Sequence, residues 1–175
     1  WLALDAPTIP DLAATACFAR SARVLGQIAE ILHRHADAAR YDALWRAVAA
    51  AFRRRFVGEG GCMQPASQSA YVLALAFDLL EDNERPAAAR HLVADIRARG
   101  NHLSTGFLGT PFLCRALAGE GYLDVAYDLL LQDTFPSWLY PLTQGATTIW
   151  ERWNGVEPEG TLFHPAMNSF NHYAY

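Results

Sequence analysis

The segment from Gln144 to Gly155 contains the residues best suited to chemistry, because it places a carboxylate among indole rings. Its sequence is QGATTIWERWNG, so Glu151 follows Trp150 directly and lies two residues before Trp153. In carbohydrate sites an indole stacks on the apolar face of a sugar ring, while a carboxylate transfers protons or activates water. The segment therefore indicates a sugar-processing site, with Glu151 as its acid–base group and Trp153 as a substrate-binding residue.

The local backbone conformation decides which side chains accompany Glu151. Residues 147–150 are β-branched or aromatic, which favours extended backbone. In an extended chain Glu151 and Trp153 share one face, with Trp150 and Arg152 on the other. In a helix the two tryptophans share a face instead. A purely structural alternative is a buried ion pair between Glu151 and Arg152.

A second polar cluster lies among aromatic residues near the end of the sequence. Asn168, Asn171 and His172 are three and four positions apart, so on a helix they form one polar face. Buried polar groups need hydrogen-bond partners, so this face lines a cleft or forms a satisfied network in the core. The spacing leaves both hypotheses open. We expect a last helix to begin near Asn168 or Ser169.

The other histidines are weaker candidates. His102 lies in the glycine-rich loop 100–110, where it can contact a ligand or cap a neighbouring helix. His33 and His35 are two positions apart at a helix end and do not share a face, so we interpret them as surface residues. The sequence has no phosphate loop, nucleophile elbow or metalloprotease motif. We therefore predict no metal and no cofactor.

The segments that must position these groups have helical periodicity. The first, Asp11–His33, has apolar residues at three- and four-residue spacing, and we expect Asp11 to be its N-cap. Five further helices are predicted over residues 36–56, 68–80, 85–99, 110–117 and 123–131. Short turns between them indicate helical hairpins. No alternating strand pattern intervenes, which argues against a parallel α/β fold.

The helices are followed by an irregular region from Asp133 to about Met167. Prolines and glycines recur through it, and it contains three of the five tryptophans. A loop of this length in a compact domain usually has a function. Together with the hairpins, it favours an all-α, double-layered helical toroid or a solenoid, with the chemistry in the loop.

Composition argues against several other classes of function. The 175 residues have a formal net charge of −4 and no basic stripe, so we expect no nucleic-acid partner. Apolar runs are shorter than the ~20 residues that span a bilayer, and no leader pattern is present, so we expect no membrane partner. Cys17, Cys62 and Cys114 have neither zinc nor redox spacing, which favours a reducing compartment.

Several segments resemble one enzyme family. The sequences TTIWERW at 147–153 and MNSFNHYAY at 167–175 resemble the most distinctive stretch of the bacterial α-L-rhamnosidases, family 78 of the glycoside hydrolases. Residues 68–75 resemble a core helix of that family, and residues 102–111 and 136–141 resemble its inter-helix loops. The resemblance covers essentially the whole chain and keeps the order of the segments.

The resemblance implies a fold, a reaction and roles for named residues. It implies an (α/α)6 barrel and hydrolysis of a terminal α-L-rhamnosyl bond with inversion of configuration. The glutamate matching Glu151 is the general base, and the histidine matching His172 lies beside the sugar. Trp1 resembles a tryptophan that lines the rhamnose pocket, and Trp153 and His102 complete the candidate substrate-binding residues. The expected partner is a rhamnose-containing glycoside or oligosaccharide.

Part of the family's machinery is missing from these residues. The general acid of the family lies in an acidic segment upstream of the position that matches Trp1, and the barrel needs more helices than the six or seven predicted here. We expect residues 1–175 to form about half of an (α/α)6 barrel, truncated at both ends, with the remainder of the catalytic domain as partner. The isolated segment is expected to be inactive and poorly stable. The expected compartment is the cytoplasm or periplasm of a bacterium.

Two other functions stay open at this level. Another (α/α)6-barrel carbohydrate-active enzyme would share the fold and place its base in a different sequence setting. A non-catalytic helical-repeat binding module would hold Glu151 in a salt bridge, away from any cleft.

Overall fold

The computed structural model describes Leu4 and residues 8–172, and its regular structure is helical. In chain order the helices are α1 (Pro10–Ile31), α2 (His35–Phe56), α3 (Gln68–Ala76), α4 (Arg85–Ala98), α5 (Thr110–Gly119), α6 (Leu123–Leu131) and the short α7 (Tyr140–Thr143). Two 3-10 turns are η1 (Glu59–Gly61) and η2 (Pro165–Met167). Among the described residues, strand-like pairing is limited to isolated bridges. The all-α prediction is confirmed.

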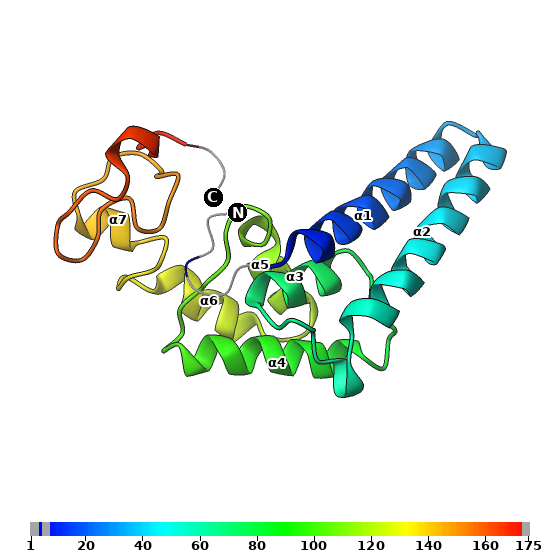
Figure 1. Ribbon diagram of the computed structural model, residues 1–175, viewed down its shortest axis with the longest axis horizontal. Helices are drawn as coiled ribbons and strands as arrows, with labels where there is room; N and C mark the ends of the chain where they lie inside the picture. Colours follow the sequence, from blue (N-terminus) through cyan, green and yellow to red (C-terminus); the bar gives the residue numbers. More distant parts are fainter. Residues whose placement is uncertain (1–3, 5–7, 173–175) are drawn as a thin grey trace.

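The first six helices pair into three hairpins, α1 with α2, α3 with α4, and α5 with α6 (Figure 1). The first helices of the hairpins form one layer, because α1 contacts α3 and α3 contacts α5. In contrast, α2, α4 and α6 contact mainly their own hairpin partners. This arrangement is a double-layered arc of hairpins, as predicted for part of a helical toroid.

The helix α3 is the centre of the core, since every residue from Gln68 to Leu75 is buried. Ser67 caps its N-terminus, with the hydroxyl oxygen accepting a hydrogen bond from the Ala70 N–H at 3.1 Å. A helix that is apolar on all sides needs neighbours on all sides, and α1, α4 and α5 supply them. The buried Gln68 side chain also holds the loop after α4, because it donates to the carbonyl oxygen of His102 at 3.2 Å and accepts from the Ser104 N–H at 2.7 Å.

Two helices expose apolar faces instead of burying them. On α1, the residues at helical spacing that are 45–63% exposed are Phe18, Leu25, Ile28 and Leu32, here called the α1 apolar stripe. On α6, the apolar residues that are 40–70% exposed are Leu123, Tyr127, Leu130 and Leu131, here called the α6 apolar stripe. Contiguous exposed apolar faces usually mark contacts with another part of a protein. Within the described part of the chain, no helix is long and apolar enough to cross a membrane.

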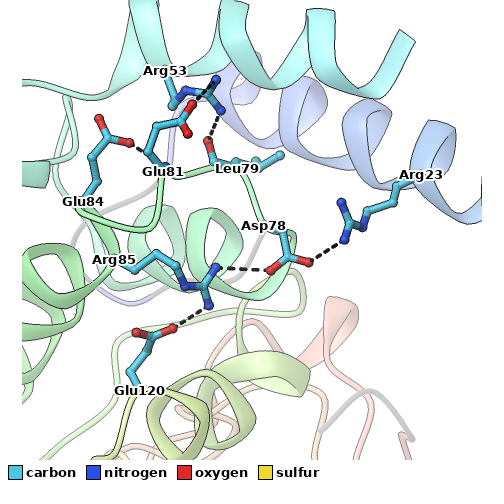
Figure 2. Close-up of polar contacts among 8 residues, drawn as sticks. All are labelled: Arg23, Arg53, Asp78, Leu79, Glu81, Glu84, Arg85 and Glu120. Carbon is cyan, nitrogen blue, oxygen red and sulfur yellow. Dashed lines mark hydrogen bonds and ion pairs between the residues drawn. The ribbon is translucent and has the colours of Figure 1, made fainter. Parts of the chain in front are cut away.

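A network of ion pairs joins the hairpins at the turn between α3 and α4 (Figure 2). The carboxylate of Asp78 forms an ion pair with Arg23 of α1 at 3.5 Å and accepts a hydrogen bond from Arg85 of α4 at 3.2 Å. The guanidinium of Arg85 also donates to Glu120, after α5, at 2.5 Å. Arg53 of α2 reaches the same turn. The network therefore ties all three hairpins to one short connection.

The ends of two predicted helices differ in the structure. Helix α1 begins at Pro10 with Ile9 as N-cap, so the prediction of Asp11 as N-cap is wrong. The carboxylate of Asp11 instead accepts a hydrogen bond from Arg55 at 2.6 Å. Helix α3 ends at Ala76 and not at residue 80. The reason is Asp78, whose φ of 55° is incompatible with continued right-handed helix.

The predicted last helix near Asn168 is also wrong for the residues that the structure describes. Residues 168–172 are non-helical, and the His172 N–H donates to the carbonyl oxygen of Ile149 at 2.8 Å. The backbone N–H of this segment thus bonds to a carbonyl oxygen in a distant loop, whereas in a helix it would bond to a carbonyl oxygen four residues earlier. Asn168, Asn171 and His172 do not form the helical polar face that their spacing suggested.

Candidate active site

The candidate site is built on two segments that lie against each other, the Glu151 loop (147–155) and the returning segment (168–172). The Glu151 N–H donates to the carbonyl oxygen of Ser169 at 2.9 Å, and the Ser169 N–H donates to Oε2 of the Glu151 carboxylate at 2.8 Å. The other oxygen, Oε1, receives no hydrogen bond from any residue that the structure describes. The half-buried carboxylate is therefore fixed through Oε2, and Oε1 can accept a hydrogen bond from another molecule.

The extended conformation predicted for the Glu151 loop does not continue past Glu151. The Gly155 N–H donates to the carbonyl oxygen of Arg152 at 3.3 Å, so the chain turns there. Trp150 and Trp153 are 6% and 3% exposed, so both are buried and the predicted alternation of faces is wrong beyond Glu151. Because it is buried, Trp153 is not the exposed sugar-stacking surface that alternation implied.

Trp153 instead ties the Glu151 loop to the helical core. Its indole N–H donates to the carbonyl oxygen of Thr105 at 2.8 Å, in the loop before α5. Its ring meets Trp138 edge to face, with 5.5 Å between the ring centroids. An aromatic pair of this geometry contributes about 0.5–1.5 kcal/mol beyond its buried area. The loop that carries Glu151 is therefore anchored to two separate parts of the fold.

Glu151 and Arg152 do not form the structural ion pair considered above. The Arg152 guanidinium lies over the ring of Phe163, with its Cζ 5.2 Å from the ring centroid, and its buried Nε has no hydrogen-bond partner among the described residues. Arg152 also lines a largely apolar cavity of about 350 Å³, together with Trp138, Trp150 and Trp153. Glu151 is outside this lining, so the cavity lies on another side of the loop.

His172 is brought to the Glu151 loop by the returning segment. Its imidazole stacks on Phe107, with 5.0 Å between ring centroids and 14° between ring planes. Its backbone N–H binds the loop at Ile149. Glu151 and His172 therefore belong to one hydrogen-bonded unit, although twenty residues separate them in sequence.

His102 is held within the chain through both ring nitrogens. Nδ1 is 2.8 Å from the carbonyl oxygen of Arg99 at the end of α4, and Nε2 is 2.8 Å from Oγ1 of Thr134. Of the two roles left open by the sequence, this geometry favours helix capping. His102 also lines a cavity of about 560 Å³ with Phe135, Asn154 and Glu157. Trp1, the remaining candidate, lies outside the described residues.

Tyr140 of α7 supports the irregular region that contains the site. Its hydroxyl donates to the carbonyl oxygen of Val156 at 3.1 Å. Burial raises the pKa of Tyr140, and the nearby carboxylates of Glu159 and Glu157 raise it further, so the hydroxyl stays protonated as a donor at neutral pH. In the part of the chain that is described, no three His, Cys, Asp or Glu side chains gather to hold a metal ion.

Sequence reasoning missed several residues that build the site. Ser169 contributes its backbone N–H, so its side-chain type carried no signal. Phe107 and Thr105 contact His172 and Trp153 from the loop 100–110, where the sequence pattern points only to the glycines and His102. The spacing of Asn168 predicts a helical polar face, whereas its amide donates to the carbonyl oxygens of Gly155 and Phe163.

The three helical hairpins and the irregular region that follows them define a helical-hairpin domain. A family model described as the bacterial alpha-L-rhamnosidase six-hairpin glycosidase domain matches residues 1–175. The chain belongs to this family.

Individual relatives agree with the family model. The alpha-L-rhamnosidase of Streptomyces avermitilis is 49% identical over 175 residues, which are 100% of this chain and 17% of the relative. That of Formosa agariphila is 47% identical over 171 residues, 96% of this chain and 18% of the relative. The chain thus spans less than a fifth of the length of either relative.

Two solved structures share the fold closely. The crystal structure of the Streptomyces avermitilis alpha-L-rhamnosidase complexed with L-rhamnose matches with a TM-score of 0.97 at 49% identity, covering 100% of this chain and 17% of that one. The native enzyme from Aspergillus terreus matches with a TM-score of 0.95 at 32% identity, covering 99% of this chain and 21% of that one.

Proposed function

We propose that the complete protein hydrolyses terminal, non-reducing α-L-rhamnosyl residues with inversion of configuration, and that Glu151 is its general base. The observation that carries the proposal is the Glu151 carboxylate, which binds the Ser169 N–H through Oε2 while Oε1 takes no hydrogen bond from the described residues. The absence of an ion pair between Glu151 and Arg152 argues against a purely structural carboxylate. Membership of the rhamnosidase family supports the substrate class.

In the proposed reaction Glu151 removes a proton from a water molecule as the water oxygen bonds to the anomeric carbon. The bond from that carbon to the leaving oxygen breaks on the opposite face, and a general acid protonates the leaving oxygen. Inverting glycosidases hold the two carboxyl groups about 6.5–9.5 Å apart, which leaves room for the water. We assign the acid to the part of the catalytic domain outside these 175 residues. The segment alone is therefore expected to be inactive.

We assign substrate contact within the described residues to His172. The resemblance to the rhamnosidases supports this assignment, since the histidine matching His172 lies beside the sugar in that family, and stacking on Phe107 fixes the plane of the imidazole. Trp153 and His102 are engaged in hydrogen bonds within the chain, so we assign them to the support of their loops. Trp1 stays a proposed pocket residue by resemblance. The expected substrate is a rhamnose-containing glycoside or oligosaccharide, in keeping with the relative whose structure contains L-rhamnose.

The test replaces Glu151 with Gln in the complete protein and follows the hydrolysis of 4-nitrophenyl α-L-rhamnoside. The amide cannot accept the proton, so kcat is expected to fall by several orders of magnitude with little change in thermal unfolding. Glu159→Gln, an exposed carboxylate in the same irregular region, is the matched control and is expected to keep wild-type kcat. Wild-type kcat in Glu151→Gln, or a first-formed rhamnose of retained configuration by NMR, would contradict the proposal.

A further inference from the structure

Asn168 joins the returning segment to the far end of the Glu151 loop. Its Nδ2 donates to the carbonyl oxygen of Gly155 at 3.2 Å and to that of Phe163 at 3.3 Å. Because two carbonyl oxygens surround this nitrogen, the orientation of the amide is determined by its partners. Asn168 immediately precedes Ser169, whose N–H binds the Glu151 carboxylate. The side chain therefore anchors the peptide unit that carries this donor.

Close packing around Gly155 preserves the anchor. A Cβ atom at this position would lie 3.3 Å from Nδ2 of Asn168, 3.1 Å from the ring of Trp150 and 3.3 Å from the ring of Phe170. Contacts this short would force the neighbours to move. Glycine thus lets the Asn168 amide approach the loop backbone while the Trp150 and Phe170 rings pack edge to face, with 5.2 Å between their centroids.

The other side of Ser169 is held as well. The Thr148 hydroxyl donates to the carbonyl oxygen of Phe170, and the His172 N–H donates to that of Ile149. These bonds keep the later part of the returning segment on the loop even without Asn168. The Asn168 amide therefore anchors the backbone just before Ser169, where the Ser169 N–H faces the Glu151 carboxylate.

We propose that Asn168 is a positioning residue that acts through Ser169 to hold the Glu151 carboxylate in its reactive orientation. The inference rests on the proposed role of Glu151 as general base. Without the amide, the peptide between residues 168 and 169 turns more freely, and the carboxylate loses its fixed donor. A shift of about 1 Å at a catalytic group can cost about 10²-fold in rate. His172 keeps its own contacts, so substrate affinity is expected to change little.

The experiment is a double-mutant cycle in the complete protein with 4-nitrophenyl α-L-rhamnoside. Asn168→Ala is expected to lower kcat by about 10²-fold with KM nearly unchanged. In the Glu151→Gln background the same substitution is expected to change the residual kcat by no more than about twofold, because residues that act as a unit are not additive. A role in folding alone would lower kcat equally in both backgrounds.

Asn154→Ala is the matched control, since it removes a similar amide from the same loop. The Asn154 Nδ2 donates to Oε1 of Glu157 at 3.1 Å and has no hydrogen bond to the returning segment. Its kcat is expected to stay within about twofold of wild type, as for an independent site. Thermal unfolding of every variant shows that the compared proteins are folded.

Each other outcome has a definite meaning. Equal losses from Asn168→Ala in both backgrounds overturn the positioning role, and so does an unchanged kcat. Full activity of Glu151→Gln removes the proposed base itself, which is a separate failure. Should Asn168→Ala not fold, Gly155→Ala replaces it, because the added methyl presses on the Asn168 amide without deleting it. The same non-additivity with Glu151→Gln is then expected, and additive losses refute the inference.

Discussion

At the scale of single residues, the candidate base is held by backbone and not by a charged partner. The Ser169 N–H fixes Oε2 of Glu151, while Arg152 lies over an aromatic ring. A neutral donor orients a carboxylate without neutralising it, which suits a group that must accept a proton. The sequence allowed Glu151 to be predicted because its residue type matters. It could not indicate Ser169, since any residue type other than proline supplies a backbone N–H.

Tyr71 gives a prediction on pH at the same scale. Its buried hydroxyl accepts from the Met63 N–H at 3.2 Å, and burial, with the hydrogen bond to Cys62, raises the pKa of Tyr71 from 10.0 to about 12. The folded protein thus keeps this proton at pH values where the unfolded chain loses it. The stabilisation that protonated Tyr71 gives the folded protein is complete below pH 10.0 and is lost as the pH rises toward about 12.

The expected result is a steeper alkaline loss of unfolding free energy in wild type than in Tyr71→Phe. Urea unfolding of the complete protein on either side of pH 10.0 measures this difference. At neutral pH the variant is expected to be less stable by about 1–3 kcal/mol, because the buried Met63 N–H loses its acceptor. Parallel alkaline profiles for the two proteins would show that Tyr71 ionises normally.

At the scale of helices, periodicity predicts the long elements well and their ends less well. The apolar spacing in α1 and the glycines after α2 marked both helices within a few residues. The end of α3 was misplaced, because Phe77, Leu79 and Leu80 continue its apolar character. What ends the helix is the left-handed conformation of Asp78, stabilised by Arg23 of the α1–α2 hairpin and by Arg85 at the start of α4. A partner as distant as Arg23 cannot be inferred from a local window of sequence.

The ion pairs around that turn make a prediction at this scale. Arg85→Leu removes the donor shared by Asp78 and Glu120, whose side chain is only 12% exposed. Leaving such a carboxylate without its partner is expected to destabilise the complete protein by about 1–3 kcal/mol in thermal or urea unfolding. The control is Arg46→Leu, which breaks a largely exposed pair with Asp42 and is expected to cost less than about 1 kcal/mol. Equal costs in the two variants would mean that the turn does not depend on its ion pairs.

At the scale of the whole molecule, the three hairpins form an arc with uncovered apolar faces. The resemblance of the sequence to the rhamnosidases predicts this partial toroid, and the contacts of α3 with α1 and α5 form its inner connections. The site could be predicted less completely. Its two segments meet through backbone hydrogen bonds that join Glu151 to Ser169 and His172 to Ile149, and neither segment has a periodic pattern. Pairing of this kind depends on the complete fold.

The α1 and α6 apolar stripes predict the behaviour of residues 1–175 produced alone. Because both stripes would meet water, the isolated segment is expected to self-associate, to bind hydrophobic dye and to unfold with little cooperativity. Light scattering, dye fluorescence and thermal unfolding measure these properties. The segment is also expected not to hydrolyse 4-nitrophenyl α-L-rhamnoside. A stable monomer with the turnover of the complete protein would refute the assignment of the acid to another part of the chain.

The perpendicular indoles of Trp138 and Trp153 contribute to the near-ultraviolet circular dichroism of the protein. Their interplanar angle is 84°, and both rings are held in one asymmetric setting. Aromatic side chains fixed in this way absorb left- and right-handed polarised light unequally in the near ultraviolet, and the signal disappears when the packing loosens. Near-ultraviolet circular dichroism can therefore report whether the loop is seated as sugar is added or an anchor is removed, without an attached label.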